Sequence, residues 1–251
     1  MLAAFDEQIR RRPGPEPGIL VEVDDHVVRV VDFTDGWSGV TWSDLAGADI
    51  DAVISAQVGR FAAAGTRWEW KFYSYDQPLT LQERLRAAGL VADEAEALMV
   101  AQIADLDLAV PPPPGIDLVP VVDEGGVDAL VQVHDQVFGG DHRRMGRAVL
   151  AGLTRQPRQV EAVVAMVGAT AAAGGRVNFH GGTDFASLWG GGTIPEWRGR
   201  GVFRSLVAHR AAAARDRGYR YLKVDASPDS QPILHIFGFI ELATATPYTL
   251  Q

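Results

Sequence analysis

One segment constrains the fold more than any other: residues 189–204 read WGGGTIPEWRGRGVFR. A strand pattern interrupted by glycines at residues 187–194 leads through a proline into a basic, glycine-rich loop. Apolar residues then recur at helical spacing from Val202, and Gly218 is a helix stop signal. This order points bare backbone N–H groups and the positive end of a helix dipole at one place. The segment therefore predicts an anion-binding site.

The common nucleotide-binding loops do not match this segment. Gly199 and Gly201 lack the further glycines of a dinucleotide-binding fingerprint, and the chain has no Gly-Lys-Ser/Thr of a P-loop. A glycine-rich turn before a helix is also a common connection between two elements that binds no ligand. On local physics alone, a phosphate or pyrophosphate ligand and a plain structural turn stay equally open.

Residues 194–201, IPEWRGRG, resemble the cofactor-binding segment of the GNAT-type N-acetyltransferase superfamily. Arg198 and Gly201 match the family's motif Gln/Arg-x-x-Gly-x-Gly/Ala, whereas Phe203 stands where a small residue is usual. The resemblance covers residues 115–251. Three later segments agree with the family in order: a strand at residues 221–226, a helix near residues 230–237 and a Gly-Phe pair at residues 238–239.

The resemblance implies that acetyl-CoA, or another acyl-CoA, is the cofactor. Backbone N–H groups at a helix N-terminus suit its pyrophosphate. Glycines in the preceding strand allow close approach of the pantetheine arm and favour a β-bulge, although a flexible strand without a chemical role stays open. The implied cofactor-binding residues are Gly191, Gly192, Thr193, Arg198, Gly199, Arg200, Gly201, Val202, Phe203 and Arg204.

Acyl transfer to an amine also needs groups that move protons, because a lysine-like ammonium is mostly protonated at neutral pH. Asp225 ends a strand near the expected meeting point of thioester and amine, and a turn cap is its alternative role. The family commonly uses a tyrosine of the last helix to protonate the leaving thiolate. Counting back from Gly238 gives Leu234 for that place, and a turn one residue shorter gives His235. Tyr248, in the last strand, is the remaining candidate acid.

Composition narrows the function classes. The 251 residues carry a net charge of −9, which argues against nucleic acid as a partner and mildly favours a cationic substrate such as an amine. The absence of cysteine excludes a disulfide, a thiolate metal site and a thioester on the enzyme. No signal-peptide pattern and no apolar run of membrane-spanning length are found, so we expect a cytoplasmic location without membrane contact.

A proline-rich segment indicates how the chain is divided into domains. Residues 111–115 are PPPPG, which favours a stiff linker between residues 1–110 and residues 116–251. The N-terminal part shows a strand, helix, glycine and strand in an order that mirrors the C-terminal part. We therefore expect tandem acetyltransferase-like folds of the α+β class, each a mostly antiparallel mixed sheet flanked by helices. The first copy is degenerate, and an unrelated α+β domain is the alternative.

The leading hypothesis is an acyl-CoA-dependent N-acyltransferase that transfers acetyl to a small-molecule or peptide amine by direct attack in a ternary complex. The loop at residues 138–142, FGGDH, is expected to select the acceptor, and Asp141 could meet a cationic amine. A non-catalytic CoA-binding sensor or regulatory module is the alternative, followed by a tRNA-dependent aminoacyl transferase. Assembly as a homodimer also stays open.

Overall fold

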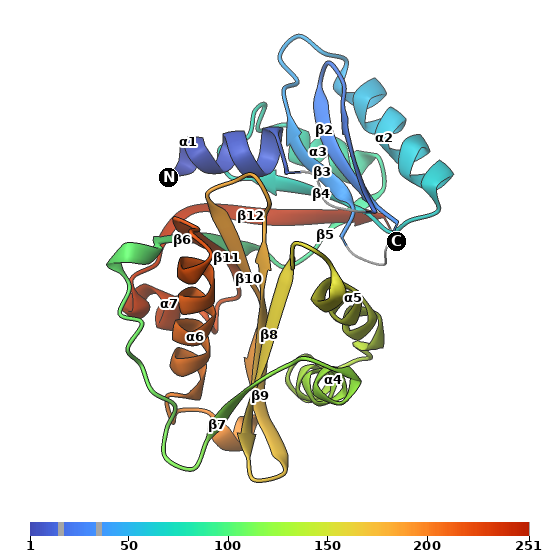
Figure 1. The fold of residues 1–251 in the computed structure, drawn as a ribbon. Coiled ribbons are helices and arrows are strands. Elements are labelled where there is room, and N and C mark those ends of the chain that lie inside the picture. The colour runs from blue at the N-terminus through green and yellow to red at the C-terminus, as the bar shows by residue number, and fades with distance from the viewer. Residues whose placement is uncertain (15–17, 34–36, 251) are drawn as a thin grey trace. The chain divides into compact units, whose positions relative to one another are not determined.

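A computed structural model describes residues 1–14, 18–33 and 37–250 (Figure 1). The chain divides into two compact units: unit 1 comprises Met1–Met99, Asp225–Gln231 and Glu241–Gln251, and unit 2 comprises Val100–Val224 and Pro232–Ile240. This division differs from the predicted boundaries at residues 110 and 116. Unit 1 includes two segments from the C-terminal part, because the last strand of the chain pairs with strands of the N-terminal part.

The sheet of unit 1 has the strand order β1-β2-β3-β4-β12, and β5 also pairs with β12. Strands β3 and β4 are parallel, and the other pairs named here are antiparallel. The elements are α1 (Leu2–Phe5), which continues as a helical segment at Asp6–Arg11, β1 (Ile19–Val23), β2 (Val27–Asp32), β3 (Gly39–Ser43), α2 (Ile50–Ala64), β4 (Glu69–Tyr73), α3 (Leu81–Ala87), β5 (Leu90–Ala92) and β12 (Ile240–Leu250).

Helix α2 shows how local chemistry sets the elements of unit 1. The side chain of Asp49 accepts a hydrogen bond from the backbone N–H of Ala52, and Gly65 ends the helix at a left-handed φ of 64°. The buried face of the helix presents Ile54 and Phe61 to a core that also contains Trp70, which is 1% exposed. Burial of this apolar face holds α2 on the sheet.

The sheet of unit 2 has the strand order β11-β10-β9-β8-β7. Strands β10 and β11 are parallel, and the other neighbours are antiparallel. Strand β6 (Glu96–Gln102) leads the chain from unit 1 into unit 2. The other elements are β7 (Asp117–Pro120), α4 (Glu124–Phe138), α5 (Arg143–Thr154), β8 (Val160–Val167), β9 (Thr170–Phe179), β10 (Phe185–Thr193), α6 (Val202–Asp216), β11 (Tyr221–Ala226), whose last two residues belong to unit 1, and α7 (Gln231–Phe237).

Helices cover both faces of the unit 2 sheet (Figure 1). On one face, α4 and α5 pack on β8 through a cluster that includes Leu130, Val149 and Val164. On the other face, α6 packs through Val202 and Leu206 on residues of β8 and β9. The predicted α+β class with a mixed sheet flanked by helices is thus confirmed. Among the helices of the described ranges, none is long and apolar enough to cross a membrane.

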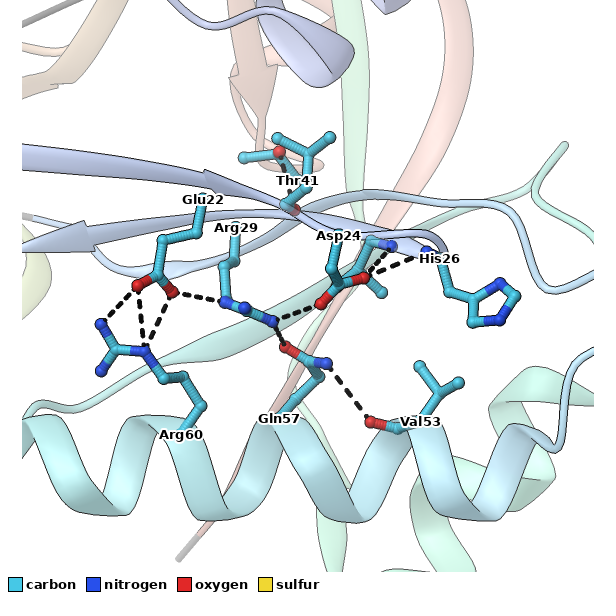
Figure 2. Close-up of polar contacts among 10 residues, drawn as sticks. Glu22, Asp24, His26, Arg29, Thr41, Val53, Gln57 and Arg60 are labelled. Atoms are coloured by element: carbon cyan, nitrogen blue, oxygen red, sulfur yellow. Dashed lines mark hydrogen bonds and ion pairs between the residues drawn. The ribbon is translucent and has the colours of Figure 1, made fainter.

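An ionic network joins α2 to the first hairpin of unit 1 (Figure 2). Glu22 of β1 accepts hydrogen bonds from Nη2 of Arg60 at 2.7 Å and from Nε of Arg29 at 2.6 Å. Arg29 also donates to Oε1 of Gln57 at 2.6 Å. Hydrogen bonding by Arg60, followed by Arg29, lowers the pKa of Glu22 from 4.5 to about 2 against the opposing effect of burial.

Replacing Glu22 with glutamine should therefore destabilise unit 1 more at pH 7 than at pH 3. The pKa is lower in the folded state, so the stabilisation is present above pH 4.5 and is lost as the pH falls toward 2. We expect Glu22→Gln to lower the unfolding free energy by about 1 kcal/mol at pH 7, as for a good surface ion pair. Urea unfolding at pH 7 and pH 3 measures the difference. The exposed Glu83→Gln is the control, and an equal loss at both pH values would contradict this electrostatic account.

Candidate functional site

The central strand of unit 2 carries a β-bulge at its glycines. In the pairing of β10 with β9, Trp189 lies opposite Arg176 and Gly192 lies opposite Gly174. Gly190 and Gly191 thus share the space opposite one residue of β9, as in a bulge. Gly190 adopts a left-handed φ of 55°, which favours glycine. The bulge that the glycines favour in the sequence is therefore present.

Both faces of the bulge are closely packed. A methyl group at Gly192 would lie 2.8 Å from Cγ1 of Val137 in α4, and one at Gly191 would lie 3.1 Å from Cε2 of Phe203 in α6. The ring of Phe203 thus occupies space that a side chain at position 191 would need. This explains how a bulky residue is accommodated where the family motif has a small one. Packing alone accounts for glycine at these positions, whether or not they contact a ligand.

The loop between β10 and α6 presents free backbone donors. Gly199 and Gly201 have positive φ values of 72° and 87°, and no side chain of the described residues caps α6. No backbone N–H of residues 199–204 donates a hydrogen bond to any other residue that the structure describes. Arg198 steadies the loop through a 3.0 Å hydrogen bond from its Nε to the carbonyl oxygen of Thr193. These donors at the start of a helix can bind a phosphate or pyrophosphate group.

On the side of β10 that faces β11, the pairing between the two strands ends before the bulge. Parallel pairing with β11 runs from Phe185 opposite Tyr221 to Ser187 opposite Lys223, whereas β10 continues to Thr193. Within the described chain, residues 188–193 have no register partner in β11. This edge leads directly to the glycine loop, so an extended ligand bound at the loop can continue along the strand.

The predicted proton-transfer residues are divided between the units. Asp225, in unit 1, is bound by Nζ of Lys71 at 2.6 Å. Tyr248, also in unit 1, is fully buried and donates from its hydroxyl to Oε1 of Gln82 at 2.9 Å. His235 lies exposed on α7 in unit 2, the unit that carries the cofactor loop. Their catalytic roles stay predictions.

The predicted acceptor loop contains an ion pair. Asp141 is exposed, and its carboxylate accepts hydrogen bonds from Arg143, with Nη2 at 2.6 Å. Hydrogen bonding by Arg143 lowers the pKa of Asp141 to about 2. Phe138 and His142 are near each other and near the ring of His134, with centroids of Phe138 and His134 5.3 Å apart. The loop thus presents aromatic groups beside the bulge.

Sequence reasoning missed His134 of α4. The residue is 3% exposed, and a methyl group at Gly190 would lie 2.8 Å from its Nε2. Burial, followed by the charge of Arg176, lowers the pKa of His134 to about 4, so the imidazole is neutral at pH 7. Its spacing from Leu130 and Val131 places it on the buried stripe of α4, and this pattern could have identified it.

A bulged central strand, an uncapped glycine loop before the next helix and helices on both faces of the sheet are the arrangement of the GNAT-type N-acetyltransferase fold. The chain has this fold, and comparison with solved structures agrees. No protein-family model and no curated protein sequence matches the chain.

A GCN5-related N-acetyltransferase from Kribbella flavida is similar over 99% of this chain and 93% of its own, with 17% identity and a TM-score of 0.70. A GCN5-related N-acetyltransferase from Sphaerobacter thermophilus matches over 91% of this chain and 81% of its own, with 12% identity and a TM-score of 0.62. A tandem GNAT protein from the clavulanic acid biosynthesis pathway matches over 94% of this chain and 84% of its own, with 14% identity and a TM-score of 0.61. The resemblance found in the sequence is thus confirmed for the fold.

Proposed function

We propose that the protein is an acyl-CoA-dependent N-acyltransferase, and most simply one that transfers acetyl from acetyl-CoA to an amine. The observation that carries this proposal is the row of free backbone N–H groups at residues 199–204, directly after the bulged strand β10. The fold is that of N-acetyltransferases. Bound acyl-CoA supplies an activated thioester. We propose direct attack by the amine in a ternary complex. The absence of cysteine excludes a thioester on the enzyme and leaves an ester on an oxygen nucleophile as the alternative.

Each part of the segment has a proposed task. The backbone of residues 199–204 holds the pyrophosphate, and the exposed side chains of Arg200 and Arg204 add positive charge near it. Gly191, Gly192 and Thr193 lie along the pantetheine arm. Backbone N–H groups turned by the bulge stabilise the oxyanion, and loss of one such donor typically costs a factor of roughly 10²–10³ in kcat.

Proton transfer is assigned less directly. The attacking amine must lose a proton, and Asp225 stays our proposed acceptor. His235 and Tyr248 stay the proposed donors to the leaving thiolate. A thiol with an ordinary pKa of about 8.5 is a fair leaving group, so a dedicated acid is not essential. A cytoplasmic location and a homodimer also stay predictions.

Binding and turnover test the proposed function separately. Titration calorimetry should show that acetyl-CoA and CoA both bind, and that AMP, which lacks the pyrophosphate and the pantetheine arm, binds far more weakly. Release of free thiol from acetyl-CoA should then depend on an added amine. Failure of both acetyl-CoA and CoA to bind would reject the proposal.

A CoA-binding sensor is the second candidate, and a specific observation favours it. Leu234 lies where the family commonly has its tyrosine, and this side chain is only 1% exposed within α7. A leucine cannot donate a proton. Tight CoA binding without thiol release for any amine would support the sensor. The acidic chain suits a tRNA-borne donor poorly.

A further inference from the structure

One face of the unit 2 sheet carries a group of polar and cationic side chains beside the bulge. Arg176 lies opposite Trp189, and Ser187 lies opposite both Asn178 and Lys223. Because side chains alternate along a strand, these residues of β9, β10 and β11 share one face. It is the face covered by α4, since a methyl group at Gly190 would lie 2.8 Å from Nε2 of His134 and 3.4 Å from Nη1 of Arg176.

Two cationic side chains of this group lie near the same indole ring, that of Trp189. The guanidinium carbon of Arg176 lies 5.8 Å from the centroid of Trp189, and Nζ of Lys223 lies 5.5 Å from the same centroid. Arg176 makes no ion pair with any carboxylate in the part of the chain that the structure describes. Burial lowers the pKa of Arg176 to about 10, so the side chain still carries its charge at neutral pH. A partly desolvated cation without an anion is costly unless a ligand supplies one.

A further polar atom on this face lacks a partner. Oδ1 of Asn178 is buried and makes no hydrogen bond to any described residue. Asp135, which follows His134 in the sequence, is hydrogen-bonded to the ring of His142 at 2.9 Å. Oδ1 of Asn178 can only accept a hydrogen bond, so the guanidinium of Arg176 is the group that suits an anion on this face, although the whole chain has a net charge of −9.

We propose that Arg176 binds an anionic group of the acceptor, so that the substrate is an amine that also carries a carboxylate or a phosphate. This inference rests on the proposed function. The planar fork of the guanidinium suits two oxygens of either group, and Trp189 supplies a flat wall beside them. Because Nη1 lies next to Gly190, an anion held there keeps the attached amine close to the bulge.

Matched pairs of amines test the inference. L-lysine with cadaverine and L-ornithine with putrescine differ by a carboxylate, and glucosamine 6-phosphate with glucosamine differs by a phosphate. Each compound is titrated into the CoA-saturated protein, and thiol release from acetyl-CoA gives kcat/KM. We expect the anionic member of at least one pair to bind roughly 10- to 100-fold more tightly, the range of a charge-assisted hydrogen bond. Which pair responds tells a carboxylate from a phosphate.

Arg176→Gln should remove this preference, and Arg176→Lys should restore part of it. Arg158→Gln, which removes an exposed cation before β8, is the matched control and should keep the preference. CoA affinity should be unchanged in all three variants. The inference is overturned if no anionic member binds, if no pair shows the preference, or if Arg176→Gln retains it. Loss of CoA affinity in Arg176→Gln would also overturn it, because Arg176 would then serve the cofactor. A different result would refute the proposed function, namely the absence of CoA binding to the unaltered protein.

Discussion

A valine at position 201 should abolish CoA binding and leave the fold in place. Gly201 precedes α6 with a φ of 87°, a conformation that a β-branched residue rarely adopts. The backbone should therefore turn, and the N–H groups of the loop would no longer point to one place. Charge-assisted hydrogen bonds are worth about 1.5–3 kcal/mol each, so losing two of them should weaken binding by about 10²-fold or more. Titration calorimetry with CoA measures this loss.

Gly218, just beyond the other end of α6, provides a matched control. Its φ is 83°, and a methyl group there would meet nothing within 4 Å. At Gly201 the nearest atom would be Cγ of Pro113 at 4.0 Å, so neither site is crowded. Gly201→Val and Gly218→Val should both cost about 1–2 kcal/mol of stability from backbone strain. Only Gly201→Val should lose CoA, and equal binding by both variants would place the pyrophosphate elsewhere.

Replacing Lys71 with methionine should give the largest loss of stability in unit 1. The Lys71 residue is 9% exposed, and its Nζ lies 2.6 Å from Asp225 and 3.7 Å from Glu96. Burial lowers the pKa of Lys71, but the neighbouring acidic groups, led by Asp225, together outweigh burial and hold the pKa above its ordinary value. Without the ammonium, the buried carboxylate of Asp225 loses its 2.6 Å ion pair, which costs about 3–5 kcal/mol. Urea unfolding of the variant measures the loss.

Two further variants distinguish the stability lost with the ion pair from the stability lost with side-chain packing. Lys71→Met combined with Asp225→Leu removes both charges and should recover most of the stability. Arg84→Gln breaks an exposed pair with Asp51, whose side chains are 53% and 62% exposed, and should change stability by less than about 1 kcal/mol. If Lys71→Met costs no more than Arg84→Gln, the pair does not stabilise unit 1.

The sequence predicted best where signals are local. Helix α2 spans Ile50–Ala64 because Asp49 caps its start and Gly65 ends it, and both residues are adjacent to the helix in the sequence. The bulge and the uncapped loop follow in the same way from the glycines of the segment 189–204. Such features depend on residues only a few positions apart, so composition and spacing contain most of the information.

Features set by distant residues were missed. Arg10 is buried because Asp76, far along the chain, binds its Nη2 at 2.8 Å, and nothing near Arg10 in the sequence indicates that pair. The cationic group at Arg176 and Trp189 likewise forms only when β9 and β10 pair. The net charge of the chain suggests a cationic ligand, whereas the charge at Arg176 suggests an anionic one. A total charge does not report local fields.

The domain boundaries failed to follow the proline segment for a related reason. Residues 111–115 are an obvious break in composition, but the compact units are set by strand pairing. In β12, Ala245 lies opposite Tyr73 and Thr249 lies opposite Glu69. Pairing across this separation in sequence leaves no local signal at Met99, where the first segment of unit 1 ends.

The pairing of β12 with β4 also has a consequence for synthesis on the ribosome. Residues 69–73 are made before unit 2, but their partner at residues 245–249 is made only after it. Unit 1 therefore has an open sheet edge and part of its core exposed until β12 is made, when all of unit 2 has already been made. Exposed strand edges favour association with other chains. Slow translation or a shortage of chaperones should therefore favour aggregation through the N-terminal part, even though this part leaves the ribosome before unit 2.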